Sequence, residues 1–374
     1  MSSQTASPVA ARVMAMTSLA FSPPSRVGDG GPWWQGVQRL SNSHAVGAVP
    51  HGKTVATIDG GKTWQTLDDF DGVGAYGGIY TTADGSAFHN VGDHKFVSPT
   101  GENVNVTGVT APSTVIVSLA GGSFTHNESG RAFSMSGLPF VHGLRVGPGG
   151  ASLWLRDGSV LLTTVTSGIG AARSQYLSVV ALHSHDAGYS WTYTGVVASA
   201  DEVPYAHEGP SENAVAYLTN GSLLCVMRVQ GENGHHSPYI SKISDDEGRS
   251  WKYLRSLSPW PGESIAPGCV LPRLLRLNGS LVLAGGRPSP SSHDVMLWLN
   301  ARGDGEAWRP YSVSYWHDRL ITNQSWAWPP NLVNRSWPRY DTSYTSLVRT
   351  GSTSAYLVYG TFDTGFALPL RLAA

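Results

Sequence analysis

The stretch Ser244-Asp245-Asp246-Glu247-Gly248-Arg249-Ser250-Trp251 reads as a tight turn followed by a strand that begins with tryptophan. An aspartate side chain accepts hydrogen bonds from backbone N–H groups two or more residues further on, and glycine adopts the positive φ that such a turn needs. The tryptophan buries a large apolar surface and fixes the turn against its neighbours. The pattern Ser-x-Asp-x-Gly-x-Ser-Trp is therefore a local structural unit, which we call an aspartate turn.

The aspartate turn recurs along the chain at a regular period. Good copies end at Trp64 and Trp191, and a worn copy at Ala301, Gly303, Gly305 and Trp308 has lost the serine and the aspartate. Trp191 and Trp251 are 60 residues apart, Trp251 and Trp308 are 57 apart, and Trp64 precedes Trp191 by 127, or about two periods. A fixed period with short strands and turn signals is typical of a β-propeller. A chain of 374 residues with a period of about 60 predicts six blades.

Hairpin signals between these turns support an all-β fold. Asp157-Gly158, Asn220-Gly221 and Asn278-Gly279 each separate two apolar runs, and no helical period is visible. Residues 1–30 are rich in Ser, Pro and Gly, so we expect a poorly ordered segment there and a propeller over 31–374. A strand within 33–49 would complete the last blade and close the ring, because closure removes exposed sheet edges.

Composition excludes several classes of function. The formal net charge is −1 with 14% charged residues, so no basic face for nucleic acid is expected. No run approaches the ~20 apolar residues of a membrane span. Six Asn-x-Ser/Thr sites favour a secretory or extracellular location. Cys225 and Cys269 are expected to be buried thiols, with a disulfide between neighbouring blades as the alternative.

The aspartate turns resemble the Asp-boxes, or BNR repeats, of the sialidase (neuraminidase) superfamily. The resemblance runs from about residue 50 to the C-terminus and implies a six-bladed β-propeller of sialidase type. It further implies an exo-acting glycoside hydrolase that removes terminal sialic acid from glycoconjugates. Because such turns also occur in propellers without catalytic activity, they indicate the fold more than the reaction.

The segment from Ser211 to Arg228 is the most specific candidate for a site. It is similar to the sialidase segment in which a Glu precedes a strand, a turn follows, and the return strand ends on an Arg; Glu212 and Arg228 hold those positions. A hairpin of this length returns both residues to one end of a blade, where propellers build ligand sites. The alternative is a solvated Glu and an Arg that caps a buried strand, although such an Arg would need a partner at depth.

Ser343-Tyr344-Thr345-Ser346-Leu347 is similar to the family segment that carries a nucleophilic tyrosine. The anomeric carbon of a sialic acid bears a carboxylate, which would repel an anionic nucleophile but not a neutral phenol. A phenol with a pKa of about 10 is a weak nucleophile by itself, so the resemblance pairs Tyr344 with Glu212 as its base. The alternative is a strand tyrosine in the core.

The family binds the substrate carboxylate with three arginines, because a guanidinium forms two parallel hydrogen bonds with a carboxylate. Arg228 matches one of them and Arg287 is a candidate for a second, although a surface-turn role fits Arg287 equally well. The third normally lies in an Arg-Ile-Pro segment, which this chain lacks; neither Arg39 nor Arg145 has that motif.

The chain also departs from the family where the general acid is expected. There is no Asp or Glu between Asp157 and Asp186. Without an acid, the leaving group departs unprotonated, at a typical loss of ~10²–10⁴-fold in rate. A carbohydrate-binding or interaction propeller that has lost the acid is therefore the alternative to a hydrolase. A sialylated or other acidic glycan is the expected partner, and the sequence calls for no cofactor and no metal.

Overall fold

The structure is a computed structural model. It describes residues 17–29, 34, 36–48, 54–67, 79–81, 87–90, 94–96, 104–106, 114–120, 123–129, 134–138, 144–146, 150–167, 169, 172, 176–186, 188, 190–231, 237–268, 270–286, 294–328, 344–361 and 364–373. Between 79 and 146 the description covers the backbone strands alone.

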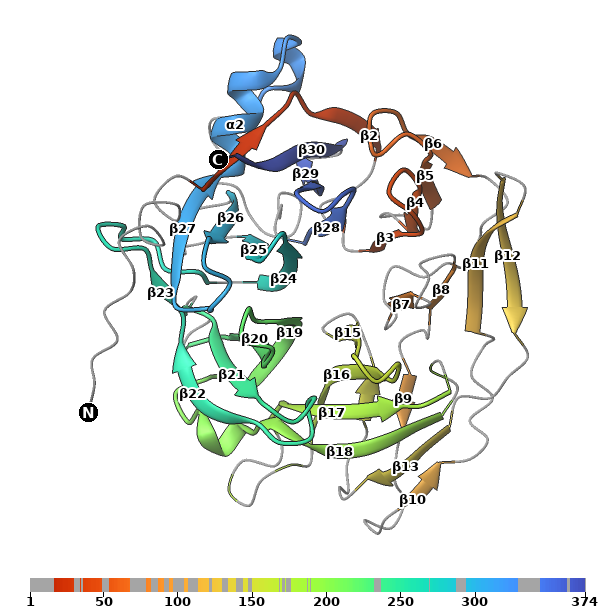
Figure 1. The fold of residues 1–374 in the computed structure, drawn as a ribbon, viewed down its shortest axis with the longest axis vertical. Helices are drawn as coiled ribbons and strands as arrows, with labels where there is room; N and C mark the ends of the chain where they lie inside the picture. The colour runs from red at the N-terminus through yellow and green to blue at the C-terminus, as the bar shows by residue number, and fades with distance from the viewer. Residues whose placement is uncertain are drawn as a thin grey trace.

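The described strands form sheets arranged in a ring (Figure 1), which confirms the predicted all-β propeller. Three of the sheets lie next to one another and carry the candidate site. The first comprises β19 (Pro210–Tyr217), β20 (Leu223–Val229), β21 (Ile240–Ser244) and β22 (Lys252–Ser256). The second comprises β24 (Val270–Leu277), β25 (Ser280–Gly286), β26 (Val295–Asn300), β27 (Ala307–Ser312) and β23 (Ser258–Pro259). The third comprises β28 (Ser346–Arg349), β29 (Ser354–Thr361), β30 (Thr364–Ala373), β1 (Ser18–Phe21) and β2 (Ser25–Asp29).

The remaining sheets complete the ring. One comprises β3 (Gly36–Arg39), β4 (Ala45–Ala48), β5 (Thr54–Thr57) and β6 (Gln65–Leu67). The next comprises β7 (Ile79–Thr81), β8 (Ala87–Asn90), β11 (Thr114–Ala120) and β12 (Ser123–Ser129). The largest has eight strands: β9 (His94–Phe96), β10 (Val104–Val106), β13 (Ser134–Leu138), β14 (Leu144–Val146), β15 (Ala151–Trp154), β16 (Val160–Thr166), β17 (Ser178–Ser184) and β18 (Ser190–Ala198).

The prediction of six blades is wrong, because five of the described sheets are blades of ordinary size. Five sheets have the four or five strands of an ordinary blade, and the other is eight-stranded because β9, β10, β13 and β14 add to the β15–β18 meander. The period was extrapolated across the long interval between Trp64 and Trp191, where the sequence carries no aspartate turn. In that interval β9, β10, β13 and β14 pair with the β15–β18 meander, whereas β11 and β12 form a separate sheet with β7 and β8.

The N-terminal boundary of the propeller also differs from the prediction. β1 and β2, within the segment 1–30 that was expected to be poorly ordered, pair antiparallel with β30. Residues of both chain ends thus share one sheet and close the ring, as expected, but through Ser18–Asp29 rather than through a strand within 33–49. The latter stretch supplies β3 and β4 of the neighbouring sheet.

One short helix was missed. α2 (Val313–Leu320) begins where the Ser312 hydroxyl accepts a hydrogen bond from the Tyr315 N–H at 3.1 Å, as an N-cap does. Its buried residues Val313 and His317 pack on the core between the sheets of β26 and β29. Two 3₁₀ turns, Ala200–Glu202 and Gln324–Trp326, are the other described helical segments. Eight residues are too few for a helical period to stand out in the sequence.

The aspartate turns have a two-sided hydrogen-bonding pattern. On the inner side, the Ser244 hydroxyl accepts from the buried Gly248 N–H at 2.8 Å. On the outer side, Asp246 accepts from the Ser250 N–H at 2.8 Å, and the Trp251 indole N–H donates to the Gly248 carbonyl at 3.0 Å. The turns before Trp64 and Trp191 repeat these contacts.

The worn copy keeps the same frame with a different residue. Asn300 Oδ1 accepts from the Gly305 N–H at 3.0 Å, in the place of the serine hydroxyl. The Trp308 indole N–H donates to the Gly305 carbonyl at 3.2 Å. The sequence pattern missed this substitution because Asn300 lies one residue outside the expected spacing.

Because the buried donor in this turn is held by Ser244, we expect Ser244→Ala to lower the free energy of unfolding by about 1–3 kcal/mol, the usual cost of a stranded buried donor. Ser222→Ala is the matched control. Its hydroxyl donates to Asp245 in an exposed hydrogen bond, so its effect should stay within about 0.5 kcal/mol. Urea denaturation of both variants measures the difference, and equal midpoints would contradict a structural role of the turn.

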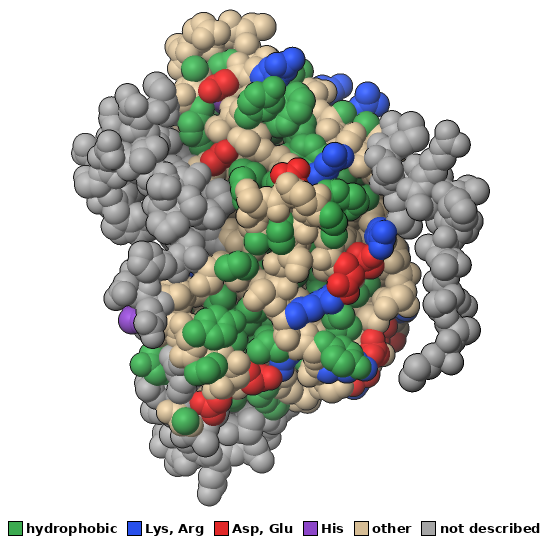
Figure 2. Space-filling model, turned by 90° about the vertical axis from the view of Figure 1, so that its left-hand side faces the viewer, with side chains coloured by type: hydrophobic (Ala, Val, Ile, Leu, Met, Phe, Trp, Pro, Cys, Tyr) green, Lys and Arg blue, Asp and Glu red, His purple; other side chains and the backbone are tan. Residues whose placement is uncertain are grey.

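The outer surface carries mixed charge. On the side shown in Figure 2, acidic and basic side chains lie close to one another. On the outer strands, Lys252 pairs with Asp245 and Arg255 with Glu306, both at 2.5 Å. No helix among the described residues is long and apolar enough to cross a membrane. Cys225 is a free, buried thiol, and Cys269 lies outside the described residues.

Candidate active site

Glu212 and Tyr344 meet at one end of the inner strands, although 132 residues separate them in the sequence. The Tyr344 hydroxyl donates to Glu212 Oε1 at 2.6 Å. Glu212 is the third residue of β19, and Tyr344 lies just before β28. The sheet of β24 lies between them. The site is thus assembled by the ring and not by a local motif.

Arg228 lies beside Glu212 at the same end of the strands. Its Nη1 lies 3.0 Å from Glu212 Oε2, and its Nη2 donates to Gln230 Oε1 at 3.1 Å. β19 and β20 pair so that Pro210 faces Val229, which returns Arg228 to the end of the hairpin where Glu212 lies. Both side chains are largely buried, with 15% of Arg228 and 14% of Glu212 exposed. A buried Arg228 was expected to need an ion-pair partner, and that partner is Glu212.

The backbone around Glu212 is irregular on both sides. β19 has a bulge between Pro210 and Asn213, and β24 has one between Val270 and Arg273. At the second bulge, the Leu271 N–H donates to Glu212 Oε2 at 2.7 Å, and Leu271 has a φ of 36°. Bulges re-aim side chains, and positive φ at a branched residue is a strained conformation that is found most often at functional sites.

Arg273 is a member of the site that the sequence did not indicate. It lies on β24, and its Nε donates to the Thr345 carbonyl at 3.0 Å. Burial lowers its pKa to about 10, while the negative charges of Glu212 and Tyr344, when ionised, act in the opposite direction. The hydrogen bond to Thr345, the residue that follows Tyr344, places Arg273 at the site. The sequence around it, Leu-Pro-Arg-Leu-Leu, is that of an ordinary strand. Nothing in this sequence indicates that Arg273 belongs to a functional site.

A second carboxylate lies at the edge of this site. Glu208 Oε1 accepts from the Ser211 hydroxyl at 3.2 Å and lies 3.8 Å from Arg228 Nη2. Burial acts to lower the pKa of Arg228, but the nearby carboxylates of Glu212 and Glu208 outweigh it and the pKa is raised. Arg228 therefore stays charged. Glu208 lies four residues before Glu212, a spacing that carried no signal in the sequence.

Arg287 lies outside the described residues, so its place in the site stays a prediction. Arg39 lies at the other end of β3, away from Tyr344, as the backbone bond from the Trp34 N–H to the Tyr344 carbonyl shows. Among the described residues no group of three or more His, Cys, Asp or Glu side chains is arranged to hold a metal ion.

The arrangement suits activation of a phenol. Glu212 Oε2 is held by Leu271 and Arg228, which leaves Oε1 directed at the Tyr344 hydroxyl. An oriented carboxylate at hydrogen-bond distance can accept the phenol proton as the oxygen attacks an electrophile. A guanidinium has five N–H donors, and the two Arg228 contacts with Glu212 and Gln230 leave others for a ligand.

Comparisons with known proteins agree with the propeller. No family model matches the chain, and no curated protein matches it. Among solved structures, a protein of unknown function from Dyadobacter fermentans aligns with a TM-score of 0.56 at 16% identity, over 95% of this chain and 99% of that one. A Hadza microbial sialidase aligns with a TM-score of 0.54 at 15% identity, over 93% of this chain and 65% of that one. A Penicillium chrysogenum α-L-arabinanase complexed with arabinobiose aligns with a TM-score of 0.54 at 12% identity, over 94% of this chain and 98% of that one.

A Trypanosoma rangeli sialidase in complex with the inhibitor DANA also aligns, with a TM-score of 0.51 at 13% identity. The chain spans 59% of the length of that sialidase and 65% of the Hadza one. At these identities the comparisons show the fold alone. The chain thus shares its β-propeller fold with glycoside hydrolases of two kinds, the sialidases and the arabinanases.

Proposed function

We propose that this protein is an exo-acting glycoside hydrolase of sialidase type, with Tyr344 as nucleophile and Glu212 as its base. The observation that carries the proposal is the 2.6 Å hydrogen bond from the Tyr344 hydroxyl to Glu212 Oε1, within a carboxylate that is fixed on its other oxygen. A tyrosine paired with a glutamate is an arrangement that departs from the usual two-carboxylate scheme of glycosidases.

The chemistry of this pair favours an acidic sugar. As the Tyr344 oxygen forms a bond to the anomeric carbon, Glu212 Oε1 takes the phenol proton and the bond to the leaving oxygen breaks. The leaving oxygen takes a proton from solvent. Water then attacks the glycosyl-tyrosine and loses a proton to solvent, and the departing phenolate regains its proton from Glu212. A neutral phenol is the better nucleophile where the anomeric carbon carries a carboxylate, because an anionic carboxylate nucleophile would be repelled by it. Arg228 and Arg273 are the proposed carboxylate clamp, with Arg287 as a further candidate.

A panel of three 4-methylumbelliferyl substrates tests the sugar class. We expect release of the fluorophore from the α-sialoside and none above background from the α-L-arabinofuranoside or the β-galactoside. Cleavage of the arabinofuranoside alone would replace the proposal with a neutral-sugar hydrolase. If no substrate is cleaved but sialic acid binds in calorimetry, the protein is a non-hydrolytic carbohydrate-binding propeller.

A further inference from the structure

A group of three arginines lies at the end of the inner strands opposite Tyr344. Each is five residues beyond a residue at the Glu212 end: Arg276 follows Leu271 on β24, Arg349 follows Tyr344 into β28, and Arg39 follows Trp34 into β3. Five residues of strand span roughly 16 Å at about 3.3 Å per residue. The two groups of polar residues are therefore separate sites on the same strands.

The three strands are neighbours in the ring, so the arginines come together. Arg349 Nη2 donates to the Arg276 carbonyl. Burial lowers the pKa of Arg349, and the charges of Arg39 and Arg276 lower it further. Arg39 and Arg349 line the same pocket, and the charge of Arg276 adds to the positive potential around Arg349.

The positive charge here is not neutralised by the described part of the chain. No ion pair joins Arg39, Arg276 or Arg349 to a carboxylate among the residues that the structure describes. Arg39 Nη2 donates to the neutral Asn42 side chain at 2.7 Å. The Nε atoms of Arg39 and Arg349 are both buried without a hydrogen-bond partner. A buried donor without an acceptor is costly, more so on a charged group.

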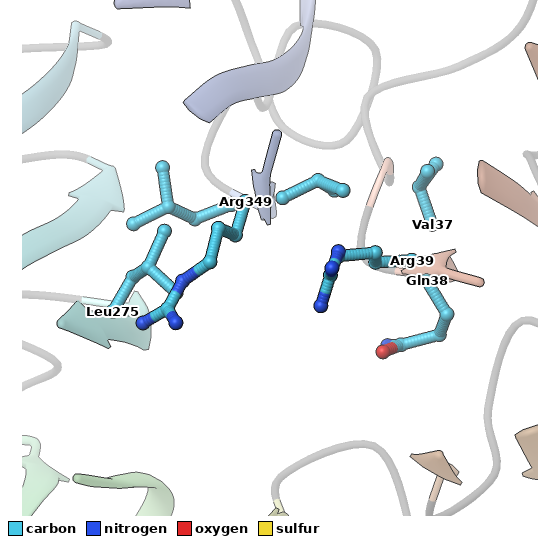
Figure 3. A pocket seen from close by; sticks show the side chains of 7 residues that line it. Val37, Gln38, Arg39, Leu275 and Arg349 are labelled. Carbon is cyan, nitrogen blue, oxygen red and sulfur yellow. The ribbon is translucent and has the colours of Figure 1, made fainter. Parts of the chain in front are cut away.

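A pocket of about 240 Å³ lies between these side chains. Figure 3 shows the guanidinium groups of Arg39 and Arg349 on either side of it, with the Gln38 amide beside Arg39. Leu275 and Leu347 form apolar parts of its wall. Pockets for drug-sized ligands are larger, at ~300–1,000 Å³, so this one suits a smaller molecule.

We propose that this pocket binds a small oxyanion, a phosphate or sulfate group, between Arg39 and Arg349. Two guanidinium groups present planar N–H donors that match the oxygens of such an anion, and Gln38 supplies a neutral donor beside them. The anion would offset the mutual repulsion of the arginines that line the pocket. The site is independent of the proposed hydrolase chemistry at Tyr344.

Calorimetric titration with inorganic phosphate and with sulfate, at constant ionic strength set by chloride, tests the proposal. We expect saturable binding to the wild-type protein and at least a tenfold weaker affinity in both Arg39→Met and Arg349→Met. Methionine keeps an apolar stem of similar length, and thermal unfolding without phosphate checks that each variant is folded. Arg302→Met is the matched control, because Arg302 is 58% exposed on an outer turn, and its affinity should equal that of the wild type.

The anion could be free phosphate or a phosphate group carried on a sugar. Competition with glucose 6-phosphate distinguishes these two ligands. Displacement of phosphate by the sugar phosphate indicates an anion carried on a sugar, and no displacement indicates the free ion. Absence of binding to the wild-type protein, or unchanged binding in both methionine variants, would overturn the proposal. Should a variant fail to fold, crystals of the wild-type protein soaked in sulfate decide: density between Arg39 and Arg349 supports the site, and its absence rejects it.

Discussion

Tyr344→Phe is expected to lower kcat/KM for the aryl sialoside by about 10⁴-fold or more, which is the scale of losing a catalytic nucleophile. Phenylalanine fills the same space, and the backbone bond from the Trp34 N–H to the residue 344 carbonyl is retained. The substitution therefore removes the hydroxyl and its bond to Glu212 with little else. Initial-rate assays of fluorophore release measure the loss.

The matched control is Tyr217→Phe, the same substitution at the opposite end of β19. The Tyr217 hydroxyl donates to Glu247 and accepts from the Arg156 N–H at 3.2 Å, far from Glu212 along the strand. Its kcat/KM should remain within about twofold of the wild type, since it removes no contact with substrate. Equal activity of Tyr344→Phe and Tyr217→Phe would exclude Tyr344 as nucleophile.

The second large effect concerns the leaving group. We expect the 4-methylumbelliferyl sialoside, whose phenolate leaves readily, to be cleaved ~10²–10⁴-fold faster than a sialyl-galactoside, whose alkoxide needs a proton. The reason is the interval without Asp or Glu between Asp157 and Asp186, where the general acid was expected. Measurement of kcat/KM for both substrates, with free sialic acid quantified, gives the ratio.

Comparable rates on the two substrates would contradict this expectation and show that a carboxylate elsewhere supplies the proton. Asp201 is then the first residue to replace. Its Oδ2 accepts a hydrogen bond from the Ala172 N–H at 3.5 Å, and Ala172 lies in the interval between Asp157 and Asp186 that contains no Asp or Glu. Glu208 is the second, since it lies 3.8 Å from Arg228. Glu202 is a poorer candidate, because it pairs with Lys242 and accepts a hydrogen bond from the Ser199 N–H at 2.9 Å.

The aspartate turns were predictable from the sequence, because the residues that form each turn lie close together in the chain. In the aspartate turn before Trp251, Ser244, Asp246 and Gly248 bond to one another within eight residues, so the sequence alone identifies it. The eight-stranded sheet was not predictable in this way. Its outer strands are held by backbone pairing, such as β13 alongside β18, which leaves no side-chain signature.

The candidate site was predictable for the residues with a recognisable neighbourhood, and only for those. Glu212, Arg228 and Tyr344 each lie in a segment similar to one in sialidases, and the structure brings these three together. Arg273 and Leu271 reach the site through a bulge in β24. A bulge is a matter of backbone register, which a pattern of apolar residues does not record.

The central claim is that the Tyr344 oxygen forms a covalent bond with the sugar. The most direct test is to treat the wild-type protein with a sialyl fluoride that carries a second fluorine beside the anomeric carbon, which slows hydrolysis of a glycosyl-enzyme. Peptide mass spectrometry should then locate one added fluorosialyl group on Tyr344, and on no residue in Tyr344→Phe. A label on another residue, or fluorophore release from the aryl sialoside by Tyr344→Phe at the wild-type rate, would contradict the claim.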